Sequence, residues 1–531
     1  MSGTSFSEPT RLALPLILIR GFGGLGVEDE KRIAYQGFND GTVYPGKRGE
    51  NYIYEGLILR FMKSAWAYQD ATNVVGYYAE EVQQRPDVPE ELKEFDPTFF
   101  SGSKVVIDPA MALHLLRETR GPRTTLWVFR YYDLNDRQFV SYGNALVRLI
   151  DFIRELGVQK DGIKHKVNII AHSMGGLLVR EAVQRTYPRL SREADDYINK
   201  IVTLGTPHQG IAFQVLKDWI NIGAEEEFEH FNPKFQSDSQ NKESYKRFGD
   251  HFPLDRLLTV VGTNYHTYNV GPASWANRLF SVSGEFGQNY NRSDGLVKQA
   301  YAQIPGAPRT FVHKCHGGPD SLVTSREAFE IATRFFFGNL QTRLRMLEGE
   351  VTRGMDMFGR SEIFLGVSIK PRRVDFELFH QSPEGENCYG PFSEANFSDS
   401  EVAFPWADDN KLIWEGYLDS SKVIPDKSTG EKDIVMRLDF YIGERDLFGV
   451  GFSDNVIFRK QLYVRAVLPT ETKPDLELFL HTGEDFNNPD FRSPMQRVQS
   501  GWEFKVEGTG FRGKFRVELN QVPEVGWPKP V

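Results

Sequence analysis

The chain has 531 residues, of which 40% are hydrophobic and 25% are charged, and its formal net charge at pH 7 is -9. This composition is typical of a globular protein that is long enough for more than one domain. The negative charge gives no basic field that would attract phosphate backbones, so nucleic acid is not expected as a partner. No window approaches the roughly 18 consecutive apolar residues of a membrane-spanning helix.

The first apolar run, Leu14 to Ile19, follows no basic segment and precedes no small-residue cleavage pattern. It therefore predicts a buried strand rather than a secretion signal. The two cysteines, Cys315 and Cys388, are too few for a disulfide framework in a chain of this length. We expect a cytoplasmic location, with leaderless export as the alternative.

Between residues 12 and 340, short aliphatic or β-branched runs alternate with helical patterns. This alternation indicates a mostly parallel sheet with helices on both faces, which places functional sites in loops at the carboxyl ends of the strands. The expected strands are Leu14 to Ile19, Thr125 to Tyr131, Val167 to Ile170, Ile198 to Leu204, Leu257 to Val261 and Thr310 to His313. The expected helices include Tyr142 to Leu156, Gly175 to Arg185 and Ser325 to Phe337.

Two insertions interrupt this alternation, at about residues 27–123 and 211–255. The first contains a helical pattern near Tyr54 and a helix start at Asp108 and Pro109, where an acidic cap precedes a proline in the first turn. The second begins with apolar residues at helical spacing. Each insertion is too long for a simple loop, so each predicts either a cap or lid over a site or an extra packing layer.

From residue 341 to residue 531 the pattern changes to an alternation of apolar and polar residues. That period of two, repeated between Gly, Pro and Asn clusters, predicts a β-sandwich-like accessory domain beside a catalytic domain at residues 1–340. We find no catalytic constellation in the accessory domain, and its many aromatic residues are expected to fill its core. The stretches that carry the pattern are VDFELF at 374–379, MRLDFY at 436–441, WEFKV at 502–506 and FRVEL at 515–519.

Ser173 lies in IIAHSMGGLL, between a predicted strand and a predicted helix. Small residues, Ala171 and Gly175, stand two positions before and after it, as a sharp strand-to-helix turn requires. Such a turn exposes the serine hydroxyl and places the backbone N–H of Met174 at a helix N-terminus, where it can stabilise an oxyanion. Ser173 is therefore a candidate nucleophile. A purely structural turn serine is the alternative.

The first predicted strand ends in the glycine-rich turn RGFGGLG at residues 20–26. Glycine lets backbone N–H groups come close to a ligand, and we assign the second oxyanion donor to Phe22. Nucleotide binding is the alternative for a glycine-rich turn in this place. It is disfavoured because GFGGLG does not have the GxGxxG spacing and no acidic partner follows at the expected distance.

The acid and the base of a triad should follow the serine in chain order. SDGLV provides Asp294 as the acid, and FVHKCHGG offers His313 and His316 as the base. We prefer His316 because it lies in the loop beyond the last predicted strand, whereas His313 falls within that strand. Asp320 follows both histidines and fits the chain order less well.

Together these segments resemble the α/β-hydrolase superfamily and, within it, the lipases. PLILIRGFGG is similar to their oxyanion turn, AHSMGG to their nucleophile elbow, TLGTPHQG to the segment after the next strand, and SDGLV to their acid loop. The resemblance implies a triad of Ser173, Asp294 and His316, with oxyanion donors at Phe22 and Met174. It also implies fatty-acid esters as substrates. Arg20 departs from the family pattern, because many lipases have a histidine before the oxyanion glycine.

We therefore expect a serine carboxylic-ester hydrolase that needs no cofactor and no metal. A phospholipase, thioesterase or acyltransferase with the same triad is one alternative, because the pocket rather than the triad selects the substrate. A non-catalytic binding protein with a hydrolase fold is another. A zinc site built on His313 and His316 lacks a third ligand at metal spacing. Transient contact with a lipid surface is compatible with these expectations, and the sequence predicts no oligomeric state.

Overall fold

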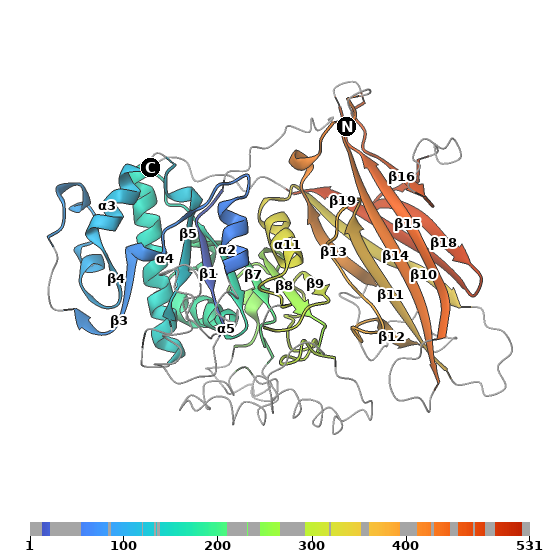
Figure 1. Ribbon diagram of the computed structural model, residues 1–531, viewed down its shortest axis with the longest axis horizontal. Coiled ribbons are helices and arrows are strands. Elements are labelled where there is room, and N and C mark those ends of the chain that lie inside the picture. Colours follow the sequence, from blue (N-terminus) through green and yellow to red (C-terminus); the bar gives the residue numbers. More distant parts are fainter. Residues whose placement is uncertain are drawn as a thin grey trace, which may run out of the picture.

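The computed structural model has a parallel sheet covered by helices on the N-terminal side of the chain and antiparallel sheets on the C-terminal side (Figure 1). This arrangement confirms the expected fold class. The structure describes residues 13–21, 55–82, 87–118, 120–131, 134, 138–209, 231, 245–265, 292–317, 320–351, 361–392, 411–425, 430–446, 455–470, 473–483 and 494–522.

The first sheet consists of seven parallel strands in the order β2-β5-β1-β6-β7-β8-β9. All six strands expected in this region are present, and β2 is an additional short strand at its edge. Their bounds are β1 (Leu16–Ile19), β2 (Gln69–Asp70), β5 (Thr125–Phe129), β6 (Val167–His172), β7 (Ile198–Leu204), β8 (Leu257–Gly262) and β9 (Arg309–Val312).

Helices cover both faces of this sheet because its strands are apolar on both sides. Leu16 and Leu18 share a buried cluster with α2 and α11, whereas Ile17 and Ile19 share another with α4 and α5. Alternate residues of one strand therefore pack into two separate helical layers. The helices are α2 (Glu55–Met62), α3 (Pro109–Arg117), α4 (Phe139–Asp161), α5 (Met174–Glu181) and α11 (Arg326–Phe337).

Side-chain caps set the start of two of these helices. The Asp108 carboxylate accepts a hydrogen bond of 2.9 Å from the backbone N–H of Met111, with Pro109 in the first turn of α3. The Ser325 hydroxyl accepts a hydrogen bond of 3.0 Å from the backbone N–H of Ala328 at the start of α11. Each cap satisfies a backbone donor that the first helical turn leaves without an acceptor.

The described residues 75–82 and 87–118 of the first insertion pack on the α4 side of the sheet, whereas α2, which also belongs to this insertion, packs with α11 on the other face. The part on the α4 side has its own secondary structure. It contains α3 and the antiparallel pair β3 (Val75–Val82) and β4 (Gly102–Ile107). Phe95 and Phe99 lie with their ring centroids 5.9 and 5.5 Å from that of Phe152. These described residues therefore form a packing layer on one side of the sheet. Residues 27–54 of this insertion lie outside the described residues, as do 211–230 and 232–244 of the second.

The C-terminal region forms two five-stranded antiparallel sheets, in the orders β13-β10-β19-β18-β17 and β12-β11-β14-β15-β16. Phe440 of the second sheet lies 4.8 Å from Phe515 of the first, centroid to centroid, so their apolar faces pack on each other. The strands are β10 (Leu340–Val351), β11 (Ser361–Pro371), β12 (Tyr389–Phe392), β13 (Leu412–Leu418), β14 (Asp433–Asp446), β15 (Asn455–Val467), β16 (Glu477–His481), β17 (Gln496–Val498), β18 (Gly501–Gly508) and β19 (Phe511–Gln521).

One expected strand, VDFELF at 374–379, is wrong. In the structure this segment is irregular apart from a single bridge between Ile369 and Phe379. Its backbone bonds to both regions, since the Leu378 N–H donates to the Ile369 carbonyl at 2.8 Å and the His380 N–H donates to the Phe311 carbonyl at 3.0 Å. The alternation of apolar residues in this segment reflects their burial at the junction between the two regions, and not pairing with a neighbouring strand.

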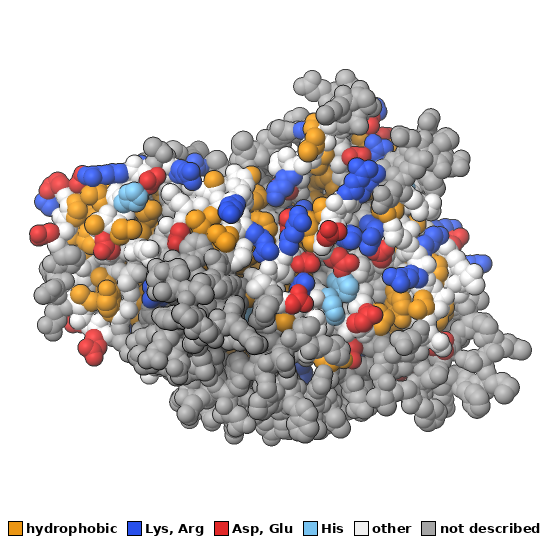
Figure 2. Space-filling view, viewed as in Figure 1, with side chains coloured by type: hydrophobic (Ala, Val, Ile, Leu, Met, Phe, Trp, Pro, Cys, Tyr) orange, Lys and Arg blue, Asp and Glu red, His pale blue; other side chains and the backbone are white. Residues whose placement is uncertain are grey.

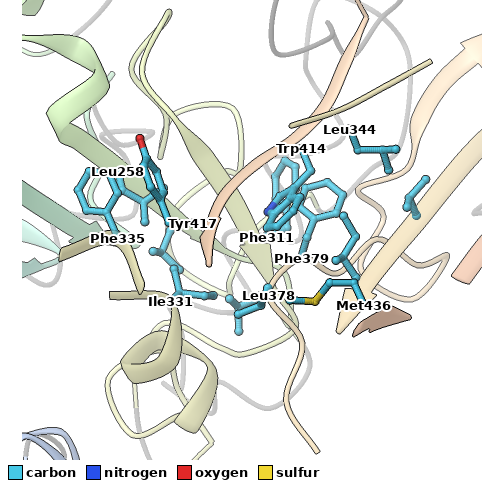
Figure 3. Packing of buried hydrophobic residues seen from close by; sticks show 14 of the residues in the cluster. Leu258, Phe311, Ile331, Phe335, Leu344, Leu378, Phe379, Trp414, Tyr417 and Met436 are labelled. Atoms are coloured by element: carbon cyan, nitrogen blue, oxygen red, sulfur yellow. The ribbon is translucent and has the colours of Figure 1, made fainter. Parts of the chain in front are cut away.

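A continuous apolar core crosses that junction. Figure 3 shows Leu258, Ile331 and Phe335 facing Tyr417, and the ring centroids of Phe335 and Tyr417 are 5.1 Å apart. The two regions therefore share buried surface. The division of the chain at residue 340 stays a prediction.

Candidate active site

Ser173 occupies a tight turn between the end of β6 and the start of α5. Its φ of 54° and ψ of -127° fall in a region that non-glycine residues rarely adopt. A Cβ atom on Gly175 would lie 2.7 Å from the carbonyl oxygens of both Ile19 and Arg20. Glycine is therefore required there, because β1 passes close to the turn. The strained turn places Ser173 just beyond the carboxyl end of β6, a central strand of the sheet.

His316 lies beside this serine. Its Nε2 is 2.9 Å from Ser173 Oγ, and its backbone N–H donates to the carbonyl of Asp294 at 2.8 Å. The imidazole comes from the loop that follows β9, and only 3% of the residue is exposed. The hydroxyl of Ser173 can thus donate to a neutral imidazole that is held within direct hydrogen-bond reach.

Asp294 completes a continuous series of hydrogen bonds. Its Oδ2 accepts from His316 Nδ1 at 2.8 Å, while its Oδ1 accepts from the backbone N–H groups of Leu296 and Val297 at 3.1 and 2.7 Å. The carboxylate therefore has partners on both oxygens although the residue is only 1% exposed. A proton on Nδ1 leaves Nε2 free to accept the serine proton.

The structure describes one of the two expected oxyanion donors. Met174 is the first residue of α5, where helix geometry leaves backbone N–H groups without an intrahelical acceptor. Phe22 lies outside the described residues. Its neighbour Gly21 is described, and a Cβ atom there would lie 2.6 Å from Ser173 Cβ and 3.3 Å from its Oγ. The backbone at Gly21, two residues after the end of β1, therefore lies directly against the serine.

His172 also belongs to this site, although its place before Ser173 in AHSMGG indicated no role for it. Its ring is buried, with Nε2 donating to the His316 carbonyl at 2.9 Å and the two ring centroids 4.8 Å apart. Burial, and then the neighbouring His316, lowers the pKa of His172 well below its ordinary value. His172 is therefore a neutral donor that fixes the backbone of the loop carrying His316.

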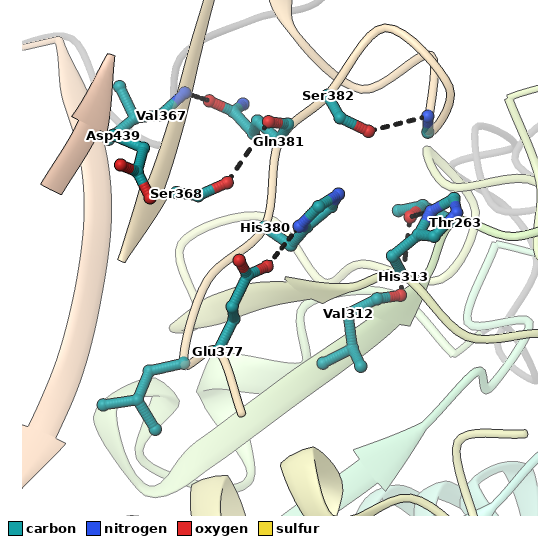
Figure 4. Close-up of polar contacts among 12 residues, drawn as sticks. Thr263, Val312, His313, Val367, Ser368, Glu377, His380, Gln381, Ser382 and Asp439 are labelled. Atoms are coloured by element: carbon teal, nitrogen blue, oxygen red, sulfur yellow. Dashed lines mark hydrogen bonds and ion pairs between the residues drawn. The ribbon is translucent and has the colours of Figure 1, made fainter. Parts of the chain in front are cut away.

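His313 lies beside Thr263 and His380, at the C-terminal region, and not in the group around Ser173 (Figure 4). Its Nδ1 lies 3.1 Å from Thr263 Oγ1, and its ring centroid is 5.2 Å from that of His380, which pairs with Glu377. Asp320 instead forms an ion pair of 2.6 Å with Lys314. The structure thus brings together Ser173, Asp294 and His316 and leaves the other candidates outside this group.

A buried arginine ties the helix behind the serine to the second insertion. Arg180 of α5 donates to the carbonyls of His208 and Tyr245 and, at 2.9 Å, to Oε1 of Gln184. The ring of Phe231 stacks on Tyr245 with the centroids 3.9 Å apart. Burial lowers the pKa of Arg180 to about 9. This cation joins His208, just before the insertion, and Tyr245 within it to the helix that begins at Met174.

Within the described ranges, no group of three or more His, Cys, Asp or Glu side chains could hold a metal ion. No helix of those residues is long and apolar enough to cross a membrane.

A family model described as "PGAP1-like alpha/beta domain" matches residues 122–263, which include β6, the turn at Ser173 and α5. Together with the seven-stranded parallel sheet and its helices, this match shows a fold of the α/β-hydrolase type. The resemblance predicted from the AHSMGG motif is confirmed at this level. No curated protein shows significant similarity to the chain.

Solved structures similar to this chain include two lipolytic enzymes. A lipase from Bacillus licheniformis in its mature form shares 15% identity, with 63% of this chain and 96% of that chain covered and a TM-score of 0.29. A phospholipase from Legionella pneumophila shares 10% identity, with 84% of this chain and 91% of that chain covered and a TM-score of 0.28.

Proposed function

We propose that the protein is a serine carboxylic-ester hydrolase that cleaves fatty-acyl or related esters through an acyl-serine intermediate. One observation carries the proposal: the series of hydrogen bonds from Ser173 Oγ to His316 Nε2 at 2.9 Å and from His316 Nδ1 to Asp294 Oδ2 at 2.8 Å. All three side chains belong to residues that are at most 9% exposed. A nucleophile, its base and an orienting carboxylate are thus aligned in a largely water-excluded site.

In the first half of the reaction, Ser173 Oγ attacks the ester carbonyl while His316 Nε2 takes the serine proton. Asp294 keeps the imidazole in the required tautomer and stabilises the imidazolium that forms. Negative charge develops on the carbonyl oxygen. The backbone N–H groups of Met174 and Phe22 are the proposed donors to that oxygen.

Collapse of the tetrahedral intermediate releases the alcohol, which receives the proton from His316, and leaves the acyl group on Ser173. His316 then accepts a proton from water, which attacks the acyl-serine. The carboxylic acid is released and the serine recovers its proton. Both halves of the reaction use the same three side chains.

The choice of ester depends on the pocket rather than on the triad. A phospholipase, thioesterase or acyltransferase would use the same series of proton transfers. Hydrolysis rates over acyl esters of rising chain length, phospholipids and thioesters distinguish the hydrolytic activities, and formation of a new ester in the presence of an acceptor alcohol identifies an acyltransferase.

Hydrolysis of p-nitrophenyl esters of rising chain length tests the proposal. We expect the wild type to hydrolyse them and Ser173→Ala to lose at least about 10³-fold in kcat/KM, because a triad acts as a unit. Ser141→Ala, a buried serine on α4, is the matched control and should retain the wild-type rate. Equal rates in Ser173→Ala and wild type would refute the assignment, as would a folded wild type that hydrolyses no ester in the series.

A further inference from the structure

A second concave site lies between α2, α11 and the 3-10 turn at Ser420–Lys422. We call it the basic groove; it has a volume of about 420 Å³, which is within the range of small-molecule sites. It has no residue in common with the group around Ser173. Its walls include Arg60, Lys63, Trp66, Arg326, Phe329 and Lys422.

Positive charge dominates the basic groove. Four of its lining side chains are cationic, and Glu330 is the only carboxylate among the lining residues that the structure describes. That carboxylate is already paired with Arg334, and its second oxygen lies 3.5 Å from Nε of Arg326. Figure 2 shows lysine and arginine side chains gathered over α2, α11 and the nearby strands. A local excess of positive charge thus exists on a chain whose net charge is -9.

Three of the four cations of the groove have no ion pair with a carboxylate among the described residues. Arg60 donates to the backbone carbonyl of Thr324 at 2.9 Å, and Lys63 and Lys422 are among the residues that line the groove. Desolvation, followed by the charge of Arg334, lowers the pKa of Lys422. Like charges held together in this way are unfavourable, so an anion in the groove would relieve the repulsion.

Aromatic side chains form a fixed apolar wall of the groove. The ring of Trp66 stacks on Phe337 with a centroid separation of 4.1 Å, and Phe329 packs edge-on to Phe61 at 4.9 Å. Nζ of Lys422 lies 4.6 Å from the Trp66 ring centroid. The ammonium group of Lys422 therefore lies over the Trp66 ring, and aromatic rings line the groove together with its cations. This lining favours a ligand with a ring or an apolar portion beside its anionic group.

We propose that the basic groove binds a phosphate monoester carried on an aromatic or apolar body. A phosphate monoester carries a charge of about -1.5 to -2 near pH 7 and accepts several charge-assisted hydrogen bonds, so it matches several cations better than a carboxylate does. The phosphate would lie among Arg60, Lys63, Arg326 and Lys422, and the organic portion would lie against the partly buried aromatic wall that Phe329 and Trp66 form. The site is independent of ester hydrolysis at Ser173.

Calorimetric titration of the wild type with phenyl phosphate, benzoate and inorganic phosphate tests the ligand chemistry. Phenyl phosphate should bind more tightly than benzoate, which has the same ring but a single charge, and more tightly than inorganic phosphate, which has no ring. Its affinity should fall as salt is added. Absence of phenyl phosphate binding, or tighter binding of benzoate, would overturn the proposal.

Charge-reversal variants test whether phenyl phosphate binds in the basic groove. Lys63→Glu and Lys422→Glu should each weaken phenyl phosphate binding by at least about tenfold, because each replaces an attraction with a repulsion in the groove. Lys505→Glu makes the same change at an exposed position on β18 and should bind like the wild type. Equal affinity in all three variants and the wild type would place the ligand elsewhere and overturn the proposal.

Competition with lipid vesicles distinguishes a lipid phosphate monoester from a soluble one. If vesicles containing phosphatidic acid displace phenyl phosphate while phosphatidylcholine vesicles do not, the groove binds the lipid form of a phosphate monoester. If neither displaces it, the groove takes a soluble ester. Both results support the site, since each requires phenyl phosphate to bind at the residues named above.

Discussion

The helix-covered parallel sheet and the antiparallel sheets place their polar side chains differently. In the parallel-sheet region, Ser173, Asp294 and His316 are buried together where strands end. In the antiparallel region, charged side chains such as Arg437 and Asp439 pair on partly exposed strand surfaces. Burying polar groups costs free energy unless they are fully paired, so a buried polar cluster at strand ends is the more informative sign of function.

The largest expected effect separates two histidines that lie three residues apart. His316→Ala should lower kcat/KM for an ester substrate by about 10³-fold or more, because it removes the base beside Ser173. His313→Ala should lower it by less than about tenfold, because His313 lies at the C-terminal region and not in the group around Ser173. Steady-state kinetics measures kcat/KM for both variants. A larger loss in His313→Ala than in His316→Ala would move the base to His313 and contradict the assignment of the buried group at Ser173.

The two regions should also differ in how much a buried and a partly exposed arginine contribute to the free energy of unfolding. Arg180→Met should reduce the free energy of unfolding by about 1–3 kcal/mol, because it leaves the buried carbonyls of His208 and Tyr245 without their donor. Arg437→Met removes a pair whose side chains are 27% and 26% exposed, and should cost about 1 kcal/mol or less. Urea titration measures both. A larger loss in Arg437→Met would contradict the ranking.

Acid should destabilise the parallel-sheet region through its buried histidines. Burial, and then Arg180, lowers the pKa of His208 well below its ordinary value. Below about pH 6.5 the unfolded chain therefore takes up a proton at this residue that the folded chain does not, so stability falls as the pH falls. His208→Gln should reduce the slope of unfolding free energy against pH by up to about 1.4 kcal/mol per unit below pH 6.5. An unchanged slope would count against this assignment.

Much of the parallel-sheet region was predictable because the sequence signals for its strands, helices and site residues lie within short segments. The strand before Ser173, the glycine after it and the chain order of Asp294 and His316 all follow from short segments. The preference for His316 rested on its place beyond the last strand, and the structure puts that imidazole against the serine. The contact from His172 to the His316 carbonyl joins residues 144 positions apart, and no local pattern contains it.

The junction between the regions was not predictable from local patterns. The segment 374–379 alternates like a strand because Phe376 and Leu378 are buried, yet the backbone at Leu378 and at the adjacent His380 bonds to β11 and to β9, one strand of each region. Likewise β2 has only two residues, Gln69 and Asp70, which is too short for any periodicity. Tertiary packing overrides sequence pattern most readily in such short or interfacial segments.

Labelling with a fluorophosphonate probe tests the central claim most directly, because the probe reacts only with a serine that its surroundings activate. We expect the folded wild type to be labelled, Ser141→Ala to be labelled equally and Ser173→Ala not to be labelled. Labelling that persists in Ser173→Ala, or that never occurs in the folded wild type, would contradict the assignment of Ser173 as the nucleophile.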